Sequence, residues 1–151
     1  MNVMSDPNTA RKGWLSLLAK SPAAQVARLW EALELDHTYT LLRAPEIGGV
    51  MVRGRSGAVG AAFNLGEMTV TRASVKLADG TVGHGYVQGR AKDHALQAAL
   101  VDALMQTDAA GAVEVGVLAP LRETLSQRKT DRAAKAAATK VDFFTMVRGE
   151  D

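Results

Sequence analysis

A hairpin in the middle of the sequence constrains the fold more than any other feature. Residues 68–78 and 81–88 are rich in strand-forming side chains, and they flank Asp79-Gly80. This dipeptide favours a two-residue turn between antiparallel strands, because both of its positions tolerate positive φ. Such a turn would place Val75 opposite His84, so one face of the hairpin is predicted to be apolar with a histidine in it. The other face would be small and basic, formed by Arg72, Ser74, Lys76, Gly83, Gly85 and Val87.

Three glycines in this region form the pattern G-x-G-x-x-x-G, at Gly83, Gly85 and Gly89. The first two fall inside the second strand of the hairpin, whereas a dinucleotide-binding fingerprint needs them in the turn between a strand and a helix. The pattern therefore argues against a Rossmann site. We interpret Gly83 and Gly85 as leaving room for a close neighbour and Gly89 as the corner before a helix. Arg90 and Lys92 would then lie at a helix N-terminus, where free N–H groups favour an anion.

The whole chain, residues 1–151, is predicted to form one α+β domain, because a chain of this length that is 47% apolar can bury a single core. Asp6-Pro7 and Ser21-Pro22 start two amphipathic helices within residues 7–35. Residues 37–88 alternate short strand-like runs with glycines, which predicts an antiparallel sheet of about four to five strands. A helix is expected over 91–106, a loop or weak strand over 111–116, and a long helix with an apolar tail over 120–151.

The charge and the cysteine content narrow the chemistry. The net charge is only +2, but residues 121–140 carry six bases against two acids. No aromatic side chains interleave with these bases, so we interpret them as a solvated or subunit-bridging helix and not as a nucleic-acid site. The chain has no cysteine, which excludes a disulfide, a thiolate nucleophile and an iron–sulfur cluster housed in it. No apolar run suits a signal peptide or a membrane span, so a cytoplasmic protein is expected.

Side chains for catalysis are sparse in this sequence. The three histidines show no zinc-binding spacing, and we expect no metal site. We predict that His84 is a hydrogen-bonded core residue and that His94 is exposed at the anion-favouring helix start. Ser56 and Ser74 lack the setting of a nucleophile, and Glu67 and Asp93 are an unremarkable pair of carboxylates.

The end of the chain is unusually apolar. Chain termini are normally polar and frayed, so these side chains are expected to bury against a last strand of the sheet or against a partner. The candidate partner-binding residues are Val141, Phe143, Phe144, Met146 and Val147. Deleting residues 141–151 should then disrupt assembly.

Three segments together resemble the PhnG family, the G subunit of the bacterial carbon–phosphorus lyase core complex. They are GWLSLLAKS near the start, GEMTVTRASVKLADGTVGHGYVQGRAKDHALQAALVDALMQ in the middle and VDFFTMVRG at the end. The similarity runs in the same order over nearly the whole chain. The hairpin T-R-A-x-V-x-L-x-D-G and the V-D-F-F-T-M-V-R-G ending are the most specific parts.

The resemblance implies a role in phosphonate catabolism. In that family the G, H and I subunits, with an ATPase-like L subunit, move the ribose triphosphate of MgATP onto an alkyl phosphonate and release adenine. The J subunit, which uses an iron–sulfur cluster and S-adenosylmethionine, later breaks the carbon–phosphorus bond. The resemblance thus implies a hetero-oligomer with H, I, J and L subunits, no cofactor in this chain, and no nucleic acid or membrane as partner.

Two hypotheses follow from the residues and the resemblance. In the first, the chain is a structural and assembly subunit of such a complex. In the second, it contributes substrate-contacting or catalytic groups at a shared active site, with Arg72, Arg90, Lys92 and His94 meeting triphosphate or phosphonate.

Overall fold

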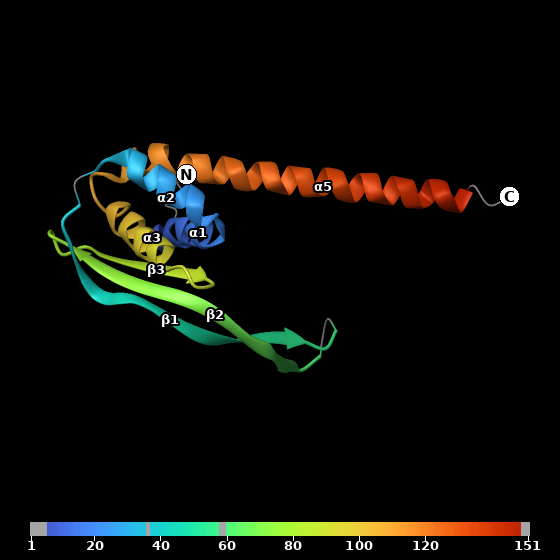
Figure 1. The fold of residues 1–151 in the computed structure, drawn as a ribbon, viewed down its shortest axis with the longest axis horizontal. Coiled ribbons are helices and arrows are strands. Elements are labelled where there is room, and N and C mark those ends of the chain that lie inside the picture. The colour runs from blue at the N-terminus through green and yellow to red at the C-terminus, as the bar shows by residue number, and fades with distance from the viewer. Residues whose placement is uncertain (1–5, 36, 58–59, 149–151) are drawn as a thin grey trace.

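The protein is an α+β domain in which helices cover one face of an antiparallel sheet and a long C-terminal helix projects from the body (Figure 1). The computed structural model describes residues 6–35, 37–57 and 60–148, and only the backbone of Asn64 and of residues 141–148. The predicted class, N-terminal helix pair and long last helix are confirmed. The elements are α1 (Pro7–Lys20), α2 (Ala23–Leu33), β1 (Tyr39–Arg55), β2 (Ala62–Leu77), β3 (Val82–Gln88), α3 (Lys92–Leu104), α4 (Ala110–Val113), the π-helix η1 (Glu114–Leu118) and α5 (Ala119–Arg148).

The first two helices begin as their sequences suggest, with one difference. The Asp6 side chain accepts a hydrogen bond from the Asn8 N–H and caps α1, with Pro7 in the first helical position. Ser21 does not cap α2. Its backbone N–H and its hydroxyl both donate to the Leu17 carbonyl, so it closes the end of α1, and Pro22 stands at the N-cap of α2 without a side-chain cap.

The central hairpin forms, but its register differs by one residue from the prediction. The Leu77 N–H bonds to the Thr81 carbonyl, so the turn encloses residues 78–80, with Gly80 at φ 93°. A three-residue turn with a left-handed glycine is the next most common hairpin connection. It pairs Ser74 with His84 and Val75 with Gly83. A one-residue slip exchanges the faces of a strand, so His84 lies on the exposed face and not in the core.

Helix α3 packs closely on the covered face of the sheet because β3 presents two glycines there. A Cβ added at Gly83 would lie 2.6 Å from the Ala103 nitrogen, and one added at Gly85 would lie 2.8 Å from the Ala99 nitrogen. The expectation that these glycines leave room for a neighbour is confirmed, and that neighbour is the backbone of α3. The buried residues of this face of the sheet are Thr71, Ala73, Val75, Leu77, Gly83, Gly85 and Val87.

The sheet has three strands in the described residues, in the order β1-β2-β3, instead of the four to five expected. Strands β1 and β2 are 17 and 16 residues long, since the glycines at 48, 49 and 54 lie inside β1 and do not end it. Beyond the end of β3, these two strands continue as a two-stranded ribbon that extends away from the helices (Figure 1). We call this ribbon, residues 49–55 and 62–69, the arm.

The segment 111–116, expected as a loop or weak strand, is helical. The chain is helical from Ala110 to Arg148, with the π-helix η1 directly before α5. Pro120 has no N–H to give to the preceding turn, and a local π segment is one way in which a helix accommodates such a position. Pro120 therefore lies within a continuous helix instead of starting one.

The carboxylate of Asp102 in α3 joins three elements. It is fully buried, and it accepts hydrogen bonds from Arg11 Nε at 3.0 Å, Arg11 Nη2 at 2.8 Å and Trp14 Nε1 at 2.8 Å in α1. It also accepts from the backbone N–H of His84 at 2.8 Å, on the outer edge of β3. Gln106 donates to the Val82 carbonyl on the same edge. The two side chains thus hydrogen-bond the His84 N–H and the Val82 carbonyl, which would otherwise be free to pair with another strand.

Replacing Gly85 by Ala should destabilise the fold, because the new methyl group meets the α3 backbone and a backbone cannot rotate away. Overpacking of this kind typically costs about 1–3 kcal/mol. Urea unfolding followed by circular dichroism measures it. Gly48→Ala is the matched control, since nothing lies within 4 Å of its added Cβ. Equal stability of the two variants would contradict the close approach of α3 to β3.

Replacing Asp102 by Ala should cost about 3–5 kcal/mol of unfolding free energy, because it leaves the Arg11 guanidinium, the Trp14 N–H and the His84 N–H without their acceptor. Asp102→Asn should cost less, since its amide oxygen still accepts hydrogen bonds. Chemical denaturation of the three proteins tests this order. If the Asp102→Ala variant were as stable as the wild type, the role assigned to the carboxylate would be refuted.

Candidate functional site

The structure does not bring together the four residues predicted to contact substrate. Arg72 lies on the exposed face of the sheet, Arg90 and Lys92 lie at the corner between β3 and α3, and His94 is in the core. The His94 side chain is only 5% exposed, and its Nε2–H donates to the Leu18 carbonyl at 2.8 Å. The expectation of an exposed His94 is wrong because α1 covers this turn of α3.

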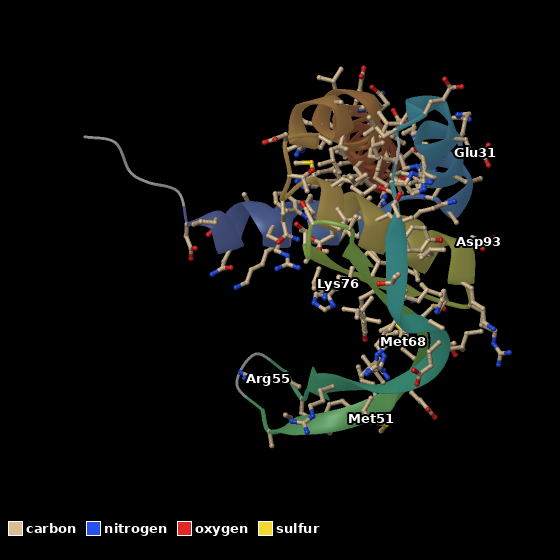
Figure 2. All side chains as sticks on the ribbon, turned by 90° about the vertical axis from the view of Figure 1, so that its left-hand side faces the viewer. Glu31, Met51, Arg55, Met68, Lys76 and Asp93 are labelled. Atoms are coloured by element: carbon tan, nitrogen blue, oxygen red, sulfur yellow. The ribbon has the colours of Figure 1, made fainter. Side chains whose placement is uncertain are left out.

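The corner itself is built as the glycine pattern indicates. Gly89 has φ 88°, and the Thr71 hydroxyl donates to its carbonyl and accepts from the Ala91 N–H. Lys92 then begins α3, which has no side-chain cap but carries the carboxylate of Asp93 in its first turn. This carboxylate offsets part of the attraction of the helix start for an anion. Figure 2 shows Asp93 on α3, away from Met51 and Arg55 on the arm.

The uncovered face of the sheet carries the polar side chains of the hairpin. Arg72 forms a long ion pair with Glu46 of β1, at 3.8 Å. The Ser74 hydroxyl lies 2.9 Å from Nδ1 of His84. A nucleophilic serine needs a base that a third group orients, and among the described residues no carboxylate hydrogen-bonds to this imidazole. The pair therefore matches an ordinary cross-strand contact.

A cleft of about 680 Å³ opens where the end of α1, the start of α2, the sheet and α5 meet. We call it the basic cleft, because Lys20, Arg128 and Arg132 line it and no acidic residue does. His94 also lines this cleft. The remaining residues that line it are Ala19, Ser21, Ala23, Met68, Val70, Tyr86, Gln88, Ala91 and Leu125. Sequence reasoning missed it because its cations are more than a hundred residues apart, although the excess of bases in residues 121–140 was a partial signal.

A second surface is apolar. Several large side chains of β1 and β2 are more than a third exposed, and Leu65 reaches 61%. We call them the apolar strip: Leu41, Leu42, Ile47, Met51, Phe63 and Leu65. Figure 2 shows Met51 on the part of the ribbon that stands away from the helices. Met51, Phe63 and Leu65 of this strip lie on the projecting arm, and exposed apolar side chains on such an element are typical of a protein interface.

The predicted partner-binding residues lie at the end of α5. The backbone of residues 141–148 is helical, so the alternative that the tail forms a last strand of the sheet is wrong. The side chains of Val141, Phe143, Phe144, Met146 and Val147 lie outside the described part of the structure, and their role as partner contacts stays a prediction.

Neither a metal site nor a membrane span is found in the parts of the chain that the structure describes. Among the side chains that the structure describes, which end at residue 140, no three of His, Asp or Glu come together as metal ligands. Over the described residues, no helix combines the length and the apolar character that crossing a membrane requires.

The burial of His94 should make stability depend on pH. Desolvation lowers its pKa below the ordinary 6.5, although the hydrogen bond to Leu18 opposes the shift. As the pH falls through 6.5, the unfolded chain binds a proton here that the folded chain resists, so the unfolding free energy should decrease, by at most about 1.4 kcal/mol per pH unit. Above pH 6.5 this contribution is constant.

Urea unfolding between pH 7.5 and 5.5 measures this dependence. His94→Gln keeps a donor for the Leu18 carbonyl but cannot titrate, so it should lose less stability over this range than the wild type. His84→Gln is the control, because its imidazole is exposed. If His94→Gln lost as much stability as the wild type, titration of His94 would not be the cause.

Comparison with known proteins agrees with the resemblance seen in the sequence. The sequence model of the family described as "Phosphonate metabolism protein PhnG" matches residues 9–149. The chain is also 43% identical over 141 residues to the alpha-D-ribose 1-methylphosphonate 5-triphosphate synthase subunit PhnG of Rhizobium meliloti (strain 1021). This alignment covers 93% of the chain and 90% of the relative. The chain therefore belongs to the PhnG family of phosphonate metabolism proteins.

Proposed function

We propose that this chain is an assembly subunit of a complex that transfers ribose triphosphate from MgATP to an alkyl phosphonate and releases adenine. The relative from Rhizobium meliloti is named as a subunit of an alpha-D-ribose 1-methylphosphonate 5-triphosphate synthase, and its similarity extends over 93% of the chain. We further propose H, I and J subunits as direct partners, with an L subunit needed for activity. The complex would work in the cytoplasm, where ATP is available.

The exposed arm is the observation that carries the assembly role. An isolated two-stranded ribbon is marginally stable in water, yet this one presents Met51 at 56% exposure and Leu65 at 61%. Its outer strand, β1, stands at the end of the sheet, so its outer edge faces no other strand of the described chain. A partner that covers the apolar side chains and the free edge would stabilise both.

Helix α5 adds a second projecting element. Every residue from 126 to 140 is exposed, and no large apolar side chain lies in this stretch. Its alanines have the highest intrinsic helix propensity, which favours the helical state without tertiary contacts. Both α5 and the arm extend from the body toward the same side (Figure 1). We propose that a partner binds to both, with the bases of α5 that lie outside the basic cleft facing an acidic surface.

Co-expression with the H, I and J subunits tests the assembly role. The double variant Met51→Lys, Leu65→Lys should fold, because exposed substitutions usually change stability by about 0.5 kcal/mol or less. It should nevertheless fail to co-purify, since two charges would be buried in the interface. The readouts are size-exclusion chromatography of the complex and circular dichroism of the variant chain.

Val115→Lys is the matched control, because Val115 is 75% exposed but belongs to η1 and not to the arm. It should remain in the complex. A folded double variant that co-purifies like the wild type would overturn the role of the arm. The same assay on a chain lacking residues 141–151 tests the predicted contribution of the tail.

If this chain instead contacts substrate, the contacts are not made by the four residues predicted from the sequence. His94 is buried and Arg72 is paired with Glu46, which leaves only Arg90 and Lys92 of the predicted set exposed at one place. The basic cleft is a better location for such contacts.

A further inference from the structure

The cations of the basic cleft share the lack of an acidic partner in the described part of the chain with other cations such as Arg53 and Arg90, but they also line one cleft in which no acidic residue takes part. Arg11, Arg43, Arg72 and Arg122 each form an ion pair with a carboxylate. Among the described residues, Lys20, Arg128 and Arg132 form none. Three like charges around one cleft repel one another, and a bound anion would relieve that repulsion.

The wall of the cleft supplies further groups for an anion. Ala23 begins α2, an 11-residue helix that has neither a side-chain cap nor an acidic residue in its first turn. The N–H groups of Gln25 and Val26 donate to the Pro22 carbonyl. The N–H groups of Ala23 and Ala24 have no acceptor among the described residues. Uncapped N–H groups at a helix start bind phosphate well. Unlike α3 with its Asp93, this helix start has no carboxylate to compete.

A buried side chain with an unused polar atom also lines the cleft. His94 is 95% buried, and Nε2–H is used by the Leu18 carbonyl. Its second ring nitrogen, Nδ1, has no hydrogen bond to any described residue. Burial lowers the pKa of His94, so the ring is neutral near pH 7 and its unprotonated Nδ1 can accept a hydrogen bond from a hydroxyl group of the ligand. The cleft therefore combines three cations, a free helix start and an imidazole.

We propose that the basic cleft binds the phosphate groups of a polyphosphate ligand. Its volume of about 680 Å³ lies in the range of small-molecule sites, and three cations neutralise most of the negative charge of a triphosphate chain. The preference for triphosphate over other anions rests on the proposed function. Lys20 and the two α5 arginines contact the phosphate oxygens, and the arginines can do so in a bidentate manner.

Calorimetric titration of the full chain with inorganic triphosphate tests the site. Arg128→Gln, Arg132→Gln and Lys20→Gln should each weaken binding about tenfold or more, as expected for loss of a charge-assisted hydrogen bond. Lys76→Gln and Lys140→Gln are matched controls, because they remove the same charge from exposed residues that do not line the cleft, on the uncovered face of the sheet and about two helical turns beyond Arg132. The controls should stay within about twofold, since distant exposed charges are screened by salt.

Two further measurements identify the ligand and its place. ATP should bind at least as tightly as inorganic triphosphate, whereas methylphosphonate should bind more weakly, because it carries less charge. The NMR signals of the His94 ring should shift on binding. Absence of binding, equal weakening by the control variants, tighter binding of methylphosphonate or an unmoved His94 ring would each overturn the proposal.

The outcome is separable from that of the assembly experiment. The cleft variants are read by ligand binding to the isolated chain, and the arm variants by co-purification. A wild-type chain that binds triphosphate but does not co-purify with the H, I and J subunits would refute the proposed function and keep this inference. A chain that assembles but binds no triphosphate would do the reverse.

Discussion

The buried carboxylate of Asp102 is the interaction on which the arrangement of this fold depends. A charge in a protein interior is tolerated only when it is paired and hydrogen-bonded, and here α1 supplies a guanidinium and an indole N–H while β3 supplies a backbone N–H. The contact with the strand is possible only because α3 approaches β3 closely over Gly83 and Gly85. One side chain thus ties helix to helix and helix to sheet, and it blocks the free edge of β3.

That arrangement gathers the helices on one side of the sheet. Because α1 and α3 lie on the covered face, no described element covers the other face or the long ribbon of β1 and β2. An uncovered surface with so many exposed apolar side chains is unusual. The same packing brings the end of α1 and the start of α2 close to α5, which forms the basic cleft. The arm and the basic cleft adjoin, because Met68 of the arm also lines the cleft, so the proposed subunit contact and the proposed ligand contact lie next to each other.

The histidines show where reasoning from sequence was reliable and where it was not. The hairpin itself was predictable, because Asp79-Gly80 between strand-forming runs is a strong local signal. Its register was not, because two-residue and three-residue turns both suit this dipeptide, and a shift of one residue exchanges the faces of a strand. His84 therefore lies outside and His94 inside, the reverse of the expectation. For His94 the deciding factor was the position of α1, which no pattern near residue 94 indicates.

The sequence by itself determined the family, the α+β class, the helix pair at the start and the need for small residues at positions 83 and 85. These follow from local propensity, from periodicity and from motifs that are contiguous in the chain. Only the tertiary structure decided that Asp102 is the buried acceptor for α1 and β3, that β1 and β2 form an exposed arm, and that Lys20, His94, Arg128 and Arg132 line one cleft. The physical reason is that burial and proximity between distant residues depend on how whole elements pack, and local sequence carries no record of that packing.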